Sequence, residues 1–138
     1  EKSVKELLKE EEKFGIKKYK TYKDFAKKVY QIRNNVKKNI SKLAKNNNKI
    51  VGYGSPAKAT TALNFFGISN EIECIVEDNK LKQGKFLPGM QIPIISKSSI
   101  KSKPNYALVL AWNFFKEIKE KNIDLADNFI SIKDLEAK

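Results

Sequence analysis

The feature that most constrains this chain is the segment Ile50-Val-Gly-Tyr-Gly-Ser-Pro-Ala-Lys-Ala-Thr-Thr-Ala-Leu-Asn64. An apolar run leads into the spacing Gly52-x-Gly54-x-x-Ala57, and a helical pattern follows it. This order is typical of a buried strand that turns sharply into a helix. Such a turn directs backbone N–H groups and the positive end of a helix toward one point, so it suits a phosphate or diphosphate. A tight strand-to-helix turn without a ligand is the alternative.

Beyond this turn, strand and helix patterns alternate. We expect strands at 49–53, 72–76 and 106–111, shorter strands at 91–95 and 129–132, and helices at 56–66 and 114–121. The first of these helices is predicted to have Ser55 as its N-cap, Pro56 at its first position and Gly67 at its end. Asn113 is predicted to cap the second. The alternation predicts an α/β, Rossmann-like three-layer domain with a mostly parallel sheet.

Two helical patterns precede the first strand. Residues 1–14 are predicted to form a short amphipathic helix that ends at Gly15. A long amphipathic helix follows, with Thr21 as its predicted N-cap and Asp24 three positions further on. Its apolar residues recur at spacings of three and four. They are Tyr22, Phe25, Val29, Ile32, Val36, Ile40 and Leu43.

The apolar stripe of the long helix is narrow, which leaves two interpretations open. The helix either packs inside this domain, or it docks on a domain outside the chain and leaves Phe25, Val29 or Val36 exposed, where a homodimer could also cover them. The chain begins at Glu1 without a Met, and we expect it to be a fragment. We expect residues 1–19 to be a helix and linker from an upstream domain, and residues 20–138 to be the Rossmann-like domain.

The composition excludes several classes of function. The net charge is +12, but Arg33 is the only arginine and the lysines are scattered, so specific nucleic-acid binding is not expected. Cys74 is the single cysteine and histidine is absent, so neither an internal disulfide nor a metal site is expected. The absence of a long apolar run or a signal peptide, together with the lone cysteine, predicts a cytoplasmic protein without a membrane segment.

Ligands of parallel sheets bind beyond the carboxyl ends of the strands. Those ends fall at Gly54-Ser55, Glu77-Asp78 and 111–113. Lys58 lies in the first turn of the helix that follows the glycine turn, where a bound anion would offset its unfavourable position against the helix dipole. The candidate binding residues are Gly52, Gly54, Ser55, Pro56, Lys58, Thr60, Asp78, Asn79, Lys82, Gln83, Trp112 and Asn113.

Three ordered blocks resemble the C-terminal domain of the SAM-dependent sugar C-methyltransferases, which act on nucleotide-linked deoxysugars. The first block, at 52–58, is similar to that family's Gly-Tyr-Gly-Ala-Pro-Ala-Lys turn, with Ser55 in place of its Ala. The second, at 78–94, is similar to its Asp-x-Asn, Lys-Gln-Gly, Pro-Gly and Pro-Ile sequence, although Asn79 here follows Asp78 directly. The third, at 104–113, matches its Pro-x-Tyr and Trp-Asn pairs.

The resemblance implies a domain that binds a nucleotide sugar and positions it for an upstream methyltransferase domain of the same chain. It places SAM, a structural zinc and the catalytic base in parts that this sequence lacks, so we expect no cofactor and no catalytic residue here. Two alternatives remain. One is a stand-alone NAD(P)-type dinucleotide-binding domain with Glu77 or Asp78 on a ribose, and the other is an interaction module that uses the helix at 22–43.

Overall fold

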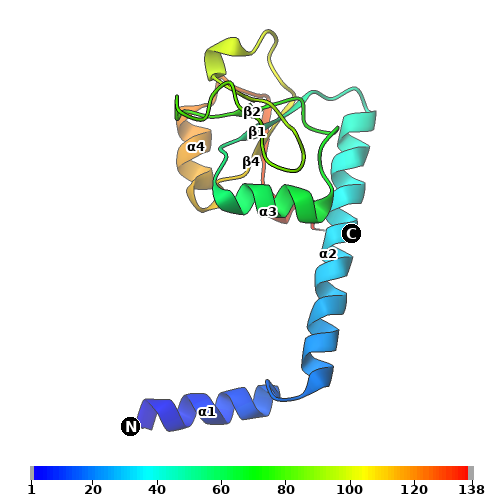
Figure 1. Cartoon of the computed structure of the whole chain (residues 1–138), viewed down its shortest axis with the longest axis vertical. Helices are drawn as coiled ribbons and strands as arrows, with labels where there is room; N and C mark the ends of the chain where they lie inside the picture. Colours follow the sequence, from blue (N-terminus) through cyan, green and yellow to red (C-terminus); the bar gives the residue numbers. More distant parts are fainter. Residues whose placement is uncertain (1, 137–138) are drawn as a thin grey trace. The chain divides into compact units, whose positions relative to one another are not determined.

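The computed structural model describes residues 2–136 and confirms the α/β fold with an all-parallel sheet. Five strands pair in the order β3-β2-β1-β4-β5. Figure 1 shows β1 between β2 and β4. The strands are β1 (Ile50–Tyr53), β2 (Ile75–Val76), β3 (Ile94–Ile95), β4 (Tyr106–Val109) and β5 (Asn128–Ile130). The helices are α1 (Lys2–Phe14), α2 (Tyr19–Lys45), α3 (Ala57–Phe66) and α4 (Phe115–Lys121), with short 3₁₀ turns η1 (Lys97–Ser99), η2 (Trp112–Phe114) and η3 (Lys133–Leu135).

The strand order reverses between β1 and β4. From β1 the chain builds outward through β2 to the edge strand β3, and it then returns to place β4 on the other side of β1 and β5 beyond it. The connections that leave β1 and β4 therefore diverge. Parallel sheets bind ligands at such a point, because the two departing chains open a crevice at the carboxyl ends of the strands.

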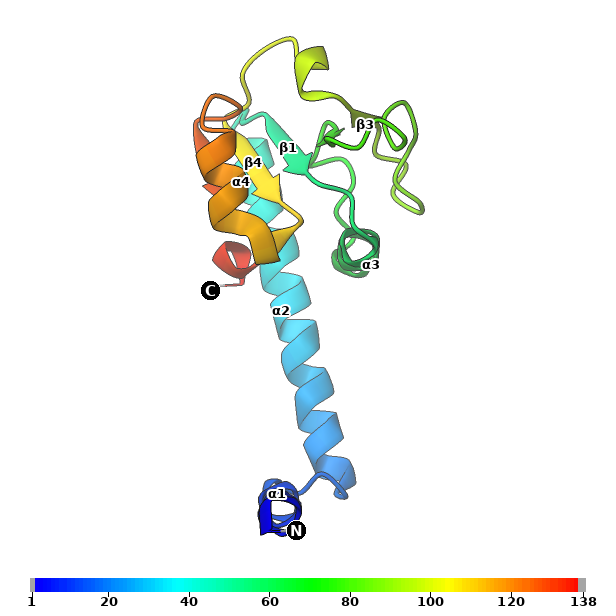
Figure 2. The ribbon, with the colours of Figure 1, turned by 90° about the vertical axis from the view of Figure 1, so that its left-hand side faces the viewer.

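Helices cover both faces of the sheet, with α3 and α4 on opposite sides (Figure 2). Alternate residues of β1 explain this, because successive side chains of a strand point to opposite faces. Val51 and Tyr53 join a buried cluster with Ala107 and Leu125, against which Ile118 of α4 packs. The other face of the sheet also carries buried apolar side chains, among them Ile50, Ile75 and Leu108. Both faces are therefore shielded from water, as is typical of parallel sheets.

Two glycines allow β1 to approach its neighbours closely. A Cβ on Gly52 would lie 3.0 Å from Leu110 Cδ1 and 3.2 Å from Ile75 Cγ1. Gly54 has φ +83°, and a Cβ there would lie 3.2 Å from the Cβ of Ala111. Any larger residue at Gly54 would be strained in this left-handed conformation as well as crowded. The glycine turn is therefore needed for the sheet itself, apart from any ligand.

The second half of α2 belongs to the core of the sheet domain. Val36 and Ile40 are completely buried. The expectation that Val36 would be exposed in a docking helix is therefore wrong. Lys37 donates hydrogen bonds of 2.6 Å to the Glu71 carboxylate and to the Gly67 carbonyl. Ser41 donates to the same carboxylate at 2.7 Å. These contacts tie α2 to the connection between α3 and β2.

Three predicted helix caps are wrong. α2 begins at Tyr19, so Thr21 lies within the helix and donates to the Gly15 carbonyl instead. The N-cap of α3 is Pro56, because the Ser55 hydroxyl is used by another partner. Asn113 lies in η2, and α4 starts two residues later without a side-chain cap. The predicted C-cap at Gly67 is confirmed by its left-handed conformation (φ 68°).

Contacts divide the chain into two compact units, one up to Ile32 and one from Arg33. This division falls within α2. Among the described residues of the first unit, eight large apolar side chains are more than half exposed. They are Val4, Leu7, Leu8, Phe14, Tyr19, Tyr22, Phe25 and Tyr30. Within residues 2–136, no helix is long and apolar enough to cross a membrane.

The buried half of α2 yields a stability prediction. Ile40→Ala should lower the free energy of unfolding by about 2–5 kcal/mol, since it removes a fully buried side chain and leaves a cavity. Leu8→Ala, at a position that is 58% exposed, should change it by less than about 0.5 kcal/mol. Urea titration followed by circular dichroism measures both. Similar losses from the two substitutions would contradict this account of the core.

Candidate functional site at the strand-order reversal

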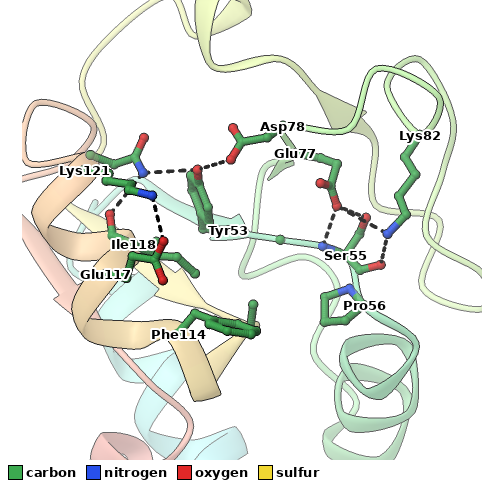
Figure 3. A pocket seen from close by; sticks show the side chains of 13 residues that line it. Tyr53, Ser55, Pro56, Glu77, Asp78, Lys82, Phe114, Glu117, Ile118 and Lys121 are labelled. Atoms are coloured by element: carbon green, nitrogen blue, oxygen red, sulfur yellow. Dashed lines mark hydrogen bonds and ion pairs between the residues drawn. The ribbon is translucent and has the colours of Figure 1, made fainter.

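A polar cleft of about 540 Å³ lies at the carboxyl ends of the central strands (Figure 3). The end of β1 and the glycine turn form its base, the end of β2 forms one wall, and α4 forms the other. Its position is the point at which the strand order reverses, between β1 and β4. The lining residues are Tyr53, Gly54, Ser55, Pro56, Glu77, Asp78, Lys82, Ala111, Phe114, Glu117, Ile118, Lys121 and Asn122.

The Glu77 carboxylate at the end of β2 binds the glycine turn directly. It accepts hydrogen bonds from the Ser55 N–H at 2.9 Å and from the Ser55 hydroxyl. Its other oxygen accepts the Asn79 N–H at 3.1 Å. The Lys82 ammonium lies 3.6 Å from this carboxylate and donates to the Ser55 carbonyl at 3.0 Å. Burial alone would raise the pKa of Glu77, but the Ser55, Asn79 and Lys82 contacts outweigh it and lower that pKa, so the group is anionic.

The predicted phosphate seat therefore has few free donors. The Gly54 N–H donates to the Val76 carbonyl at 2.8 Å, and the Ser55 N–H donates to Glu77. Pro56 has no N–H. The Glu77 carboxylate occupies the place where an external anion would accept from the Ser55 N–H. The turn is therefore closed to anions on the side that faces Glu77.

A second polar cluster surrounds Tyr53 on the other side of the cleft. Its hydroxyl donates to Asp78 at 2.7 Å and accepts the Asn122 amide N–H at 3.1 Å. Burial, together with the neighbouring Asp78 carboxylate, raises the pKa of Tyr53 to about 12. The phenol is therefore neutral at physiological pH and fixes Asp78 in place as an exposed hydrogen-bond acceptor.

The α4 wall adds a third charged pair and an aromatic ring. Lys121 and Glu117 form an ion pair of 2.7 Å across one helical turn, and Phe114 is 60% exposed beside them. The cleft thus carries three carboxylates, two ammonium groups and an accessible ring. Such a mixed set can both accept from and donate to the hydroxyl groups of a polyol, and the ring can cover a sugar face.

A second cavity, of about 560 Å³, lies beside α3 and is mainly apolar. The Lys58 ammonium lies 4.2 Å from the centre of the Trp112 ring there, a cation–π contact. Phe65, Phe66 and Ile132 add apolar lining. The same two turns border both cavities, since Pro56 and Ala111 line the polar cleft while Lys58 and Trp112 line this one.

The structure separates the candidate binding residues into groups. The polar cleft contains Gly54, Ser55, Pro56, Asp78 and Lys82. Asn79 and Gln83 brace Glu77, the latter through a 2.7 Å bond from its amide to the Glu77 carbonyl. The remaining five are distributed elsewhere. Lys58 and Trp112 line the apolar cavity, Gly52 packs inside the sheet, and Thr60 and Asn113 line neither space.

Among the lining residues that sequence reasoning missed, four have polar side chains that it never considered. Tyr53 lay inside an apolar strand pattern, and only its hydroxyl at a strand end could have indicated a polar role. Glu117 and Lys121 show the i, i+4 spacing of a helical ion pair, which is common on solvated surfaces and so gave little signal. Asn122 follows α4 and had no motif. Glu77 was considered as a ribose ligand or as part of a strand-end pair that caps the next turn, and its bond to the Asn79 N–H agrees with the second of these; its contact with the glycine turn was not predicted.

The fold and this cleft define an α/β domain of the Rossmann-like class with a polar cleft at its strand-order reversal. A family model for the C-methyltransferase C-terminal domain matches residues 1–130, and the chain belongs to that family. It is 34% identical over 128 residues to the C-methyltransferase NovU of Streptomyces niveus. That match covers 91% of this chain but 30% of the relative, so the chain spans less than a third of the relative's length.

The Tyr53 cluster predicts a pH dependence of stability. A folded-state pKa near 12 against 10.0 for an ordinary tyrosine means that the unfolded chain loses this proton first. Stability should therefore fall as the pH rises from about 10 to about 12, by about 1.4 kcal/mol at pH 11 from this group. Urea unfolding at pH 9 and pH 11 should show that decrement in the wild type and not in Tyr53→Phe. Equal pH dependence of the two proteins would contradict the assignment.

Proposed function

We propose that this domain binds the acceptor of a SAM-dependent C-methyl transfer, a nucleotide-linked sugar, and positions it for a catalytic domain outside this chain. The observation that carries the proposal is the mixed polar cleft at the carboxyl ends of β1, β2 and β4. Membership of the C-methyltransferase family supports it, because a methyltransferase needs an acceptor site as well as a donor site. The cleft offers hydrogen-bond partners of both kinds, which suits hydroxyl groups better than an apolar acceptor.

The two cavities suggest how such a ligand would lie. The sugar would occupy the polar cleft, with Asp78 and Glu117 accepting from its hydroxyl groups. The nucleotide would leave the cleft on the side of the two turns that faces away from Glu77 and enter the apolar cavity, where its base would stack on Trp112. Lys58 lies against that ring and would contact the diphosphate. A nucleotide sugar is long enough to use both spaces, and a free sugar is not.

The rest of the reaction belongs to other parts of the full protein in this proposal. SAM, a structural zinc and the catalytic base would be supplied there, and the protein would act in the cytoplasm. The exposed apolar side chains of the first unit, among them Leu7, Leu8 and Phe25, would be covered by the methyltransferase domain of the same chain. A homodimer that covers the same side chains is the alternative for a chain studied alone.

Nucleotide-sugar binding is directly measurable through Trp112, the only tryptophan of the chain. A nucleotide-linked deoxysugar should quench its fluorescence with saturation. Lys58→Ala should weaken that binding by about 1–3 kcal/mol, the scale of a charge-assisted hydrogen bond. Lys38→Ala, at an exposed position on α2, is the matched control and should leave the affinity unchanged. Calorimetry measures the same affinities without using Trp112 fluorescence, which the loss of Lys58 could itself change. Equal losses from both variants would indicate diffuse attraction to polyanions.

The division of labour yields a second test. The 138-residue chain, incubated with labelled SAM and nucleotide-linked deoxysugars, should transfer no methyl group. Positioning accelerates a reaction only where the reacting groups are present. A longer protein that includes the methyltransferase domain should show transfer, and Asp78→Asn in that protein should raise KM for the sugar. Turnover by the 138-residue chain alone would refute the proposal and move the catalytic groups into this domain.

A further inference from the structure

The two halves of a dinucleotide-binding fingerprint meet each other in this domain. In dinucleotide folds the glycine turn holds the pyrophosphate, and an acid at the end of the second strand holds the ribose. Here that acid is Glu77, and its carboxylate points back at the turn, where it accepts from the N–H and the hydroxyl of Ser55 (Figure 3). The donors of the glycine turn and the acceptor at the end of the second strand are therefore hydrogen-bonded to each other.

We infer that Glu77 is a specificity-determining residue that closes the glycine turn to phosphate groups and so excludes dinucleotides such as NAD. The Ser55 N–H is the donor that a pyrophosphate at this turn would need, and Glu77 already occupies it at 2.9 Å. A phosphate beside Glu77 would also place two anions in contact at a site where the side chain is only 12% exposed. Such a like-charge contact in a poorly solvated place is strongly unfavourable.

The surroundings of Glu77 keep the carboxylate in this position. Its second oxygen accepts the Asn79 N–H at 3.1 Å, and the Gln83 side chain donates to its carbonyl at 2.7 Å. Lys82 bridges the carboxylate and the Ser55 carbonyl, so the cation that could have drawn in a phosphate is already neutralised. The lowered pKa of Glu77 agrees with this network, because the group stays charged throughout the physiological range.

Removal of the carboxylate should open the turn. Glu77→Ala frees the Ser55 N–H and the Lys82 ammonium, so NAD and inorganic pyrophosphate should bind at least tenfold more tightly than to the wild type. Glu73→Ala is the matched control. It makes the same change of net charge at the other end of β2, before the strand begins, where Glu73 is exposed and pairs with Lys49. Calorimetry gives the affinities, and the NMR shift of the Ser55 amide during a pyrophosphate titration shows where the anion binds.

Glu77→Gln provides a second variant if Glu77→Ala fails to fold, as judged by circular dichroism. Its neutral amide keeps the shape of the side chain but can be displaced by an anion, so the Ser55 amide should shift with pyrophosphate in this variant. It should not shift in Glu73→Gln or in the wild type. The inference is overturned if the Ser55 amide shifts in the wild type as it does in the variants. It is also overturned if neither Glu77 variant gains affinity relative to its Glu73 control.

Discussion

The close approach of β1 to β4 is the constraint on which the rest of this domain depends. A side chain at Gly52 would strike Leu110 and Ile75, and one at Gly54 would meet Ala111 in a left-handed backbone. Because these two positions carry no Cβ, the carboxyl ends of β1 and β4 lie side by side. Their following turns then separate, toward α3 and toward η2, and the space between them becomes the cleft. The glycines thus create the site through packing, before any contact with a ligand.

The polar groups at the strand ends are arranged to satisfy one another. Glu77 binds the Ser55 turn, and Tyr53 links Asp78 to Asn122 across the two central strands. Among the residues that the structure describes, every buried side-chain nitrogen or oxygen has a partner. A site whose hydrogen bonds are complete without a ligand is preorganised, so the free energy of binding is not used to order these side chains. The same completeness limits which ligands can reach the buried groups, because a new partner for one of them must replace an existing one.

The fold was largely predictable from the sequence, since strand and helix periodicity is local and the apolar runs at 50–53 and 106–109 are unambiguous. The strand predicted at 72–76 is longer than β2 (Ile75–Val76), although the backbones of Glu73 and Cys74 still form hydrogen bonds with β1. The predicted cap at Ser55 failed because its hydroxyl bonds to the Glu77 carboxylate, which lies too far along the chain to be seen in a local pattern.

The candidate binding residues lie in two different cavities and inside the sheet, which shows why a glycine motif alone cannot identify a ligand. The spacing Gly52-x-Gly54 specifies a backbone shape, and that shape is present. Whether the shape receives a phosphate depends on the group that faces it, and here that group is a carboxylate from the end of the next strand. The chain carries a net charge of +12, yet this cleft holds three carboxylates against two ammonium groups. The local charge at the turn is therefore opposite in sign to the net charge of the chain, and neither the overall charge nor the fold class would have predicted it.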